Sequence, residues 1–221
     1  MKLEKIQRGF ERNLLLLPGW GFDVSIFFNQ KWEYNLWFFE NFSLNSELAI
    51  NKLRQEHESF SVLAWSIGGF ILDKWFKTDS LLKNKIEKVF LMSVPAYFNA
   101  DIVEKIKIGL KSNLVNTLKH FYSLVFYGNI DFYKKFVDQY QTKYLSLFSY
   151  EDLIYGLNFL QKYKQDFNQF QELSTLYFYS EKDYIVSYSS VQSFLPSNVH
   201  IVPNTHIPFW YNEVVNAVNQ K

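Results

Sequence analysis

The segment FSVLAWSIGG (residues 60–69) decides the fold prediction. Its apolar run, residues 60–65, predicts a buried strand, and the apolar residues that follow Ser66 recur at helical spacing. A serine between a strand and a helix stands on a sharp turn where the two elements nearly touch, so its near neighbours must be small. Ala64 and Gly68 meet that need, which is typical of a nucleophile elbow with alanine in place of the first glycine. By itself the segment also fits a serine that caps an ordinary helix.

Working outward, strands and helices alternate on both sides of this segment. Short apolar runs predict strands at residues 14–17, 36–39, 89–94, 175–179 and 199–202, and helices are expected around residues 49–53 and 212–220. Residues 97–171 carry helical patterns, with Asp101 and Glu104 as an expected capping box. The alternation predicts an α/β fold: a mostly parallel sheet flanked by helices. We expect a core of residues 1–96 and 172–221, and a helical insertion of residues 97–171.

The amino-acid composition excludes several classes of protein and of active site. The chain has 221 residues, of which 48% are hydrophobic, and a formal net charge of +1. A near-neutral chain has no global nucleic-acid footprint, and the absence of cysteine excludes disulfides, thiolate metal sites and cysteine nucleophiles. The charged first 13 residues do not resemble a signal peptide or a membrane span. We expect a cytoplasmic monomer that needs neither metal nor cofactor and binds neither membrane nor nucleic acid.

A serine nucleophile needs a base, and the base needs an orienting carboxylate. His206 follows the last predicted strand in a loop, so it can hang over the carboxyl edge of the sheet beside Ser66. Asp183 follows the strand at residues 175–179, with Glu181 as its nearest rival. The order Ser66, Asp183, His206 is that of α/β-hydrolases. The other histidines fit less well: His57 in a charged stretch, His120 in the helical insertion and His200 inside a strand.

The tetrahedral intermediate of ester hydrolysis needs two backbone donors. The elbow can supply the amide of Ile67, and the loop Pro18-Gly19-Trp20-Gly21 can supply the amide of Trp20. This gives a role to a glycine cluster that is otherwise a plain turn with a core tryptophan.

These motifs resemble the α/β-hydrolase superfamily and, within it, the pimeloyl-[acyl-carrier protein] methyl ester esterases of biotin synthesis. The matching pieces span nearly the whole chain in the right order: LPGWG (17–21), AWSIGG (64–69), YSEKDYIV (179–186) and NTHIPF (204–209). The resemblance implies a serine carboxylesterase that frees the pimeloyl carboxylate, with an acidic acyl-carrier protein as partner. It also implies that Trp20 and Trp65 contact the substrate and that the helical insertion forms a lid.

Two groups of residues in the helical insertion have expected roles. Phe121 and Phe126 could line an acyl tunnel, although helical spacing equally fits ordinary packing. A basic face could dock the carrier, although a solvated helix surface would look the same; its lysines are Lys105, Lys107, Lys111 and Lys119. A generic carboxylesterase or thioesterase, or a catalytically silent binding module of the same fold, remain alternatives.

Overall fold

The computed structural model describes residues 2–40 and 46–220. A seven-stranded sheet forms the centre, in the order β1-β3-β2-β4-β5-β6-β7. All strand pairs are parallel except β1 with β3, which confirms the predicted mostly parallel α/β sheet. The strand bounds are β1 (Lys2–Ile6), β2 (Asn13–Leu17), β3 (Asn35–Glu40), β4 (Phe60–Trp65), β5 (Ile86–Met92), β6 (Thr175–Lys182) and β7 (Val199–Asn204).

The edge strand β1 was missed by the sequence analysis. Its residues KLEKI are mostly exposed and carry charges at most positions, so they lack the apolar run of a buried strand. Its pairing with β3 uses backbone hydrogen bonds, which any sequence can make, and its lysines suit an exposed sheet edge.

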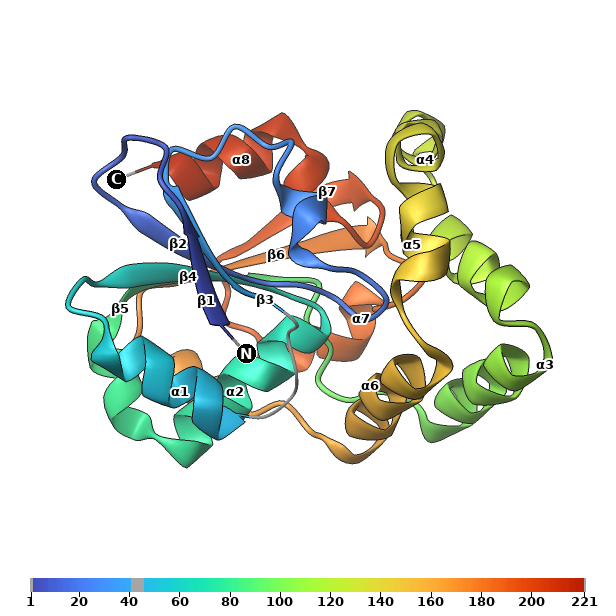
Figure 1. The fold of residues 1–221 in the computed structure, drawn as a ribbon, viewed down its shortest axis with the longest axis horizontal. Coiled ribbons are helices and arrows are strands. Elements are labelled where there is room, and N and C mark those ends of the chain that lie inside the picture. The colour runs from blue at the N-terminus through green and yellow to red at the C-terminus, as the bar shows by residue number, and fades with distance from the viewer. Residues whose placement is uncertain (1, 41–45, 221) are drawn as a thin grey trace.

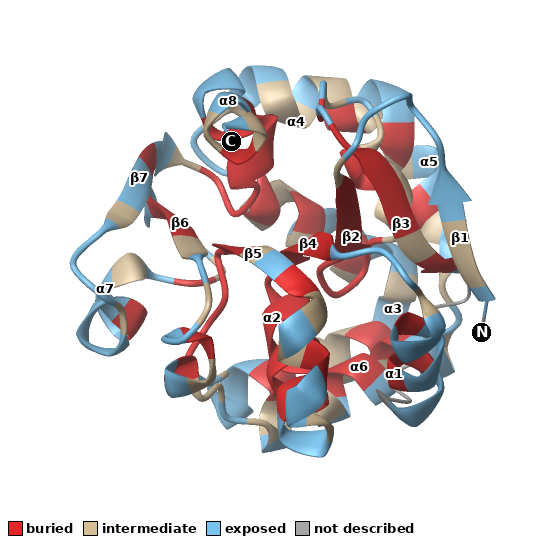
Figure 2. Ribbon diagram, turned by 90° about the vertical axis from the view of Figure 1, so that its left-hand side faces the viewer, coloured by how far each residue is buried: buried red, intermediate tan, exposed pale blue. Residues whose placement is uncertain are grey.

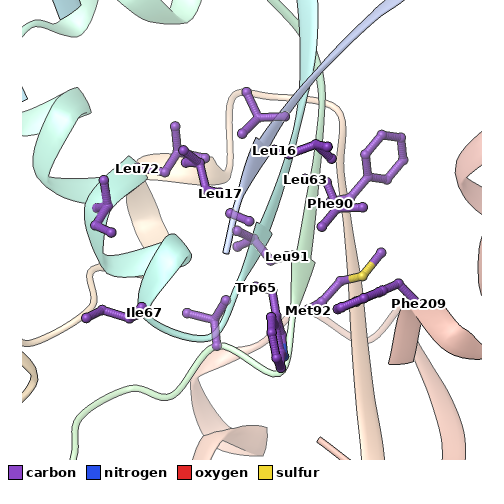
Figure 3. Close-up of a cluster of buried hydrophobic side chains, with 14 of the residues drawn as sticks. Leu16, Leu17, Leu63, Trp65, Ile67, Leu72, Phe90, Leu91, Met92 and Phe209 are labelled. Carbon is purple, nitrogen blue, oxygen red and sulfur yellow. The ribbon is translucent and has the colours of Figure 1, made fainter. Parts of the chain in front are cut away.

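Helices cover both faces of the sheet (Figure 2). On one face lie α1 (Ser46–Gln55) and α2 (Ile67–Thr78), and on the other lies α8 (Asn212–Asn219); the short α7 (Tyr188–Val191) follows β6. The central strands β2 and β4 are buried along their whole length, because helices pack on both of their faces. Buried leucines of these strands, among them Leu16, Leu17 and Leu63, lie close together in the core (Figure 3).

The chain between β5 and β6 forms the helical insertion, which lies beyond the carboxyl ends of the strands (Figure 1). It contains α3 (Ala100–Val125), α4 (Ile130–Phe136), a π-helical turn (Val137–Gln141), α5 (Thr142–Leu147) and α6 (Tyr150–Lys162). A non-helical residue, Asn113 (φ −156°, ψ 94°), kinks α3. The expected capping box was wrong: the side chain of Asn99 caps α3, and Asp101 donates its backbone N–H to that cap.

A buried carboxylate joins the core to the end of the helical insertion. Asp73 of α2 is fully buried, and its Oδ2 accepts hydrogen bonds from Lys77 Nζ (2.8 Å), Tyr163 OH (3.1 Å) and Asp166 N (3.0 Å). Burial raises the pKa of Asp73 even though Lys77 and the other donors act to lower it. No helix within residues 2–40 and 46–220 is long and apolar enough to span a membrane.

Candidate active site

The turn between β4 and α2 holds Ser66 in a strained backbone conformation. Ser66 has φ 55° and ψ −119°, in a region that non-glycine residues rarely adopt, and its side chain makes no capping hydrogen bond to α2. The helix-cap alternative therefore does not describe this serine. A Cβ on Gly68 would lie 2.4 Å from the carbonyl oxygen of Leu17, so the elbow requires glycine there. This close approach is the reason for the small residues around Ser66.

Two further strand ends near Ser66 carry strained residues. Ser93 (φ 48°) follows β5 and Thr205 (φ 76°) follows β7, and both are fully buried. Ser66 N donates to Met92 O (2.9 Å) and Ser93 N donates to Phe178 O (2.9 Å), so these turns are tied to neighbouring strands. Such strain persists only where the surroundings hold it, and it concentrates at functional sites.

His206 and Asp183 form a buried hydrogen-bonded pair. His206 Nδ1 lies 2.7 Å from Asp183 Oδ2, and the two residues are 1% and 6% exposed. The other oxygen, Asp183 Oδ1, accepts the backbone N–H groups of Ile185 (2.8 Å) and Val186 (2.9 Å), which fixes the carboxylate. The carboxylate makes Nδ1 the protonated nitrogen of a neutral imidazole and leaves Nε2 as the basic one.

The alternative acid and the other three histidines do not take part in this buried pair. Glu181 is an exposed residue of β6, and His57, His120 and His200 are all exposed. His200 stacks on Phe178, with ring centroids 4.9 Å apart. His206 is therefore the one histidine of the four that the fold buries beside a carboxylate.

Both residues whose amides are expected to bind an oxyanion line one cavity. Trp20 and Ile67 line a cavity of about 530 Å³ next to the elbow. Within residues 2–40 and 46–220, neither backbone N–H has a hydrogen-bond partner. The walls come from the loop after β2, the end of β3, the start of α2 and the helical insertion; among them are Gly19, Phe22, Phe39, Ile71, Phe148, Leu153 and Gly156. Ser66 itself is 5% exposed.

The helical insertion packs directly against the loop that carries Trp20. Trp20 Nε1 donates to Leu153 O of α6 (3.0 Å), and the Trp20 ring meets Phe121 edge-on with centroids 4.7 Å apart. A Cβ on Gly156 of α6 would lie 2.7 Å from Cδ1 of Trp20, so a larger residue there would displace the indole. The indole of Trp20 is therefore positioned by the insertion rather than by the sheet.

A polar network that the sequence analysis missed strengthens this contact. Asp23 accepts hydrogen bonds from Ser25 Oγ (2.5 Å), Tyr144 OH (2.7 Å) and Lys143 Nζ (2.8 Å). Burial acts to raise the pKa of Asp23, but the hydrogen bonds from Lys143, Ser25 and Tyr144 outweigh it, and the pKa lies below its ordinary value. Asp23 lies 120 positions from Lys143 and 121 from Tyr144 in the sequence, and no sequence motif marks these residues.

The remaining expected substrate contacts lie away from the cavity walls. Trp65 is fully buried and Phe126 is 1% exposed; Phe126 stacks on Phe136 with centroids 4.7 Å apart. Phe121 is partly buried against Trp20. Both phenylalanines pack against other aromatic rings here, and a contact of either with an acyl chain stays a prediction.

The lysines of the expected docking face differ in their surroundings. Lys105, Lys111 and Lys119 are exposed on α3, whereas Lys107 is half-buried and binds Glu104 (2.7 Å) and Gln161 (2.7 Å). The first three present free charge to solvent, and Lys107 holds α3 against α6.

No family model and no curated protein sequence matches this chain. Solved structures do match over nearly its whole length. A hydrolase from Oleispira antarctica has a TM-score of 0.75 at 12% identity and covers 99% of this chain and 94% of its own. An esterase from Exiguobacterium antarcticum gives 0.71 at 15% identity, with 99% and 95% covered. A bromoperoxidase from Bacillus anthracis gives 0.71 at 17% identity, with 98% and 91% covered. At such low identity the likeness shows architecture only: together with the seven-stranded sheet, it shows that the chain has the α/β-hydrolase fold.

Proposed function

We propose that the protein is a serine hydrolase that cleaves carboxylic esters, with Ser66 as nucleophile, His206 as general base and Asp183 as the carboxylate that orients it. The observation that carries this proposal is the buried His206–Asp183 pair on the same sheet edge as a strained serine elbow. His206 Nδ1–H is engaged by Asp183, so Nε2 is the nitrogen that can accept the serine proton.

The reaction would proceed through an acyl-enzyme. His206 takes the proton of Ser66 as the oxygen attacks the ester carbonyl, and the amides of Trp20 and Ile67 stabilise the oxyanion. The C–O bond to the alcohol breaks, and His206 protonates the departing alkoxide. Water then attacks the acyl group by the same route, His206 accepts a proton from it, and the carboxylic acid leaves as Ser66 regains its proton.

The decisive experiment is covalent labelling of the folded protein with a fluorophosphonate. Attachment to Ser66, together with hydrolysis of short p-nitrophenyl esters by the wild type, supports the serine hydrolase. Failure to label Ser66 while the protein remains folded favours a catalytically silent binding module.

We further propose that the substrate is the methyl ester of a pimeloyl chain on an acyl-carrier protein. The support is the set of matching motifs, the apolar cavity beside the elbow, and the exposed charges of Lys105, Lys111 and Lys119 toward an acidic carrier. The charged residues of the cavity wall are Asp23, Glu40 and Asp152, all acidic, so a neutral esterified chain suits it better than a free carboxylate.

Rescue of a biotin-requiring bacterial strain that lacks its own pimeloyl-ester esterase tests this substrate directly. Rescue by the wild type but not by Ser66→Ala is expected. Hydrolysis of short esters or acyl thioesters without rescue would favour the generic esterase or thioesterase.

A further inference from the structure

The main chain of His206 is held at both of its polar groups by different parts of the molecule. Its N–H donates to Val125 O, at the end of α3 (2.8 Å), and its carbonyl accepts from Trp65 Nε1, at the end of β4 (2.6 Å). Its side chain is held by Asp183. Because His206 lies in a loop after the strained Thr205, its position depends on such contacts rather than on a regular element.

The side chain of Trp65 contacts His206 directly. The side chain is fully buried, and its ring packs against Phe22 (4.8 Å between centroids), Phe209 (5.2 Å) and His206 (5.6 Å). Figure 3 shows Trp65 at the end of its strand, beside Met92 and Phe209. A buried indole N–H needs a partner, and the carbonyl of His206 is that partner.

We infer that Trp65 is a positioning residue that sets the distance between base and nucleophile. Trp65 is bonded covalently to Ser66 and by a short hydrogen bond to the main chain of His206, so one rigid side chain connects the two groups between which the proton moves. This role rests on the proposed function, and it replaces the expectation that Trp65 contacts the substrate. It also explains why a tryptophan occupies the end of β4: phenylalanine keeps an aromatic ring at this position but has no donor.

The chain offers a matched control for this contact. Trp32 is also buried, and its Nε1 donates to the carbonyl of Phe27 (2.9 Å) rather than to His206. Trp32→Phe and Trp65→Phe each delete one buried indole donor to a backbone carbonyl, so both lose comparable stability. Only Trp65→Phe removes a hydrogen bond to the main chain of His206.

The test compares kcat, KM and the pH profile of ester hydrolysis in the two variants with the wild type. We expect Trp65→Phe to lower kcat by about 10-fold to 100-fold, since small displacements of a catalytic group cost rates of that order, with a much smaller change in KM. The limb of the pH profile that reports the histidine should shift. Trp32→Phe should melt at a lower temperature but keep the wild-type kcat and pH profile.

A second readout does not depend on turnover. In proton NMR, the Nδ1–H of His206 bonded to Asp183 should give a low-field signal, and Trp65→Phe should broaden or shift it while Trp32→Phe leaves it unchanged. Wild-type kcat and an unchanged signal in Trp65→Phe would overturn the inference, as would equal losses in the two variants. If Ser66→Ala keeps full ester turnover, the proposed function fails, and the NMR comparison still decides whether Trp65 positions His206.

Discussion

The carboxyl edge of the sheet and the helical insertion are built on different physical principles. At the sheet edge, three non-glycine residues, Ser66, Ser93 and Thr205, adopt strained backbone conformations. Main-chain hydrogen bonds tie the first two of them to neighbouring strands. In the insertion, aromatic rings cluster: the centroid of the Phe136 ring lies within 6.2 Å of those of Tyr122, Phe126, Tyr140 and Tyr144, and of Phe22 in the loop after β2. The carboxyl edge of the sheet therefore fixes the positions of individual atoms, whereas the insertion contributes packed aromatic side chains.

Substitutions in the two regions should therefore change different properties of the protein. Backbone strain and hydrogen bonds leave few alternatives at the edge, so a change there should lower kcat. Aromatic packing tolerates changes of similar volume, so a change in the insertion should mainly alter affinity or stability.

Ser66→Ala and His206→Ala should each lower ester turnover by at least ~10³, because members of a catalytic triad act as a unit. Turnover of p-nitrophenyl esters by purified variants is the measurement, and circular dichroism should show that both remain folded. Near-normal turnover in either variant would contradict the roles proposed for the sheet edge.

Gly68→Ala should lower both stability and turnover. A glycine-to-alanine change inside a helix ordinarily stabilises it by ~1 kcal/mol. Here the new methyl group would overlap the backbone of Leu17, so we expect a loss of about 1–3 kcal/mol in the free energy of unfolding. Urea denaturation measures this change, and a variant more stable than the wild type would show that the elbow relaxes at little cost.

Asp23→Asn should weaken the contact between the Trp20 loop and the helical insertion by about 1.5–3 kcal/mol, the range for hydrogen bonds to charged groups. Because the pKa of Asp23 is lowered in the folded protein, its contribution to stability is present above the ordinary value of 3.8 and is lost as the pH falls through the folded value. Denaturation between pH 3 and pH 7 should therefore show a shallower acid decline in Asp23→Asn than in the wild type. An identical decline would exclude this network as its cause.

Asp73 should change the free energy of unfolding with pH in the opposite direction to Asp23. Its pKa is raised by burial, so the folded state binds more protons than the unfolded state above pH 3.8, and this group lowers stability as the pH rises through that window. Asp73→Asn should remove that fall. Parallel pH profiles for Asp73→Asn and Asp23→Asn would contradict the assignment of the two shifts.

Charge reversal on the insertion should have the smallest effect. Lys111→Glu combined with Lys119→Glu should lower kcat/KM on a carrier-bound ester by roughly 3-fold to 10-fold at low salt, with little effect on short soluble esters. Lys31→Glu with Lys52→Glu, two exposed lysines outside the insertion, is the matched control. Equal loss on both substrates would count against carrier docking on α3.

Much of the fold was predictable because its signals are local. The strand at residues 60–65 agrees in both bounds with β4, and β6 and β7 begin at the predicted residues. Buried parallel strands must be continuously apolar, so they appear in the sequence as runs. The edge strand β1 has one exposed side and needs no such run, so it left no signal.

From the sequence alone it follows that Ser66 stands on a strand-to-helix turn and that Asp183 and His206 follow later strands. Small residues and apolar runs can be recognised in a few adjacent residues, and the order of the strands is the order of the chain. Tertiary structure alone decided that Asp183 rather than Glu181 holds the histidine, and that the indole of Trp65 binds the main chain of His206. Those choices depend on distances between residues as many as 141 positions apart, which packing sets and no local pattern encodes.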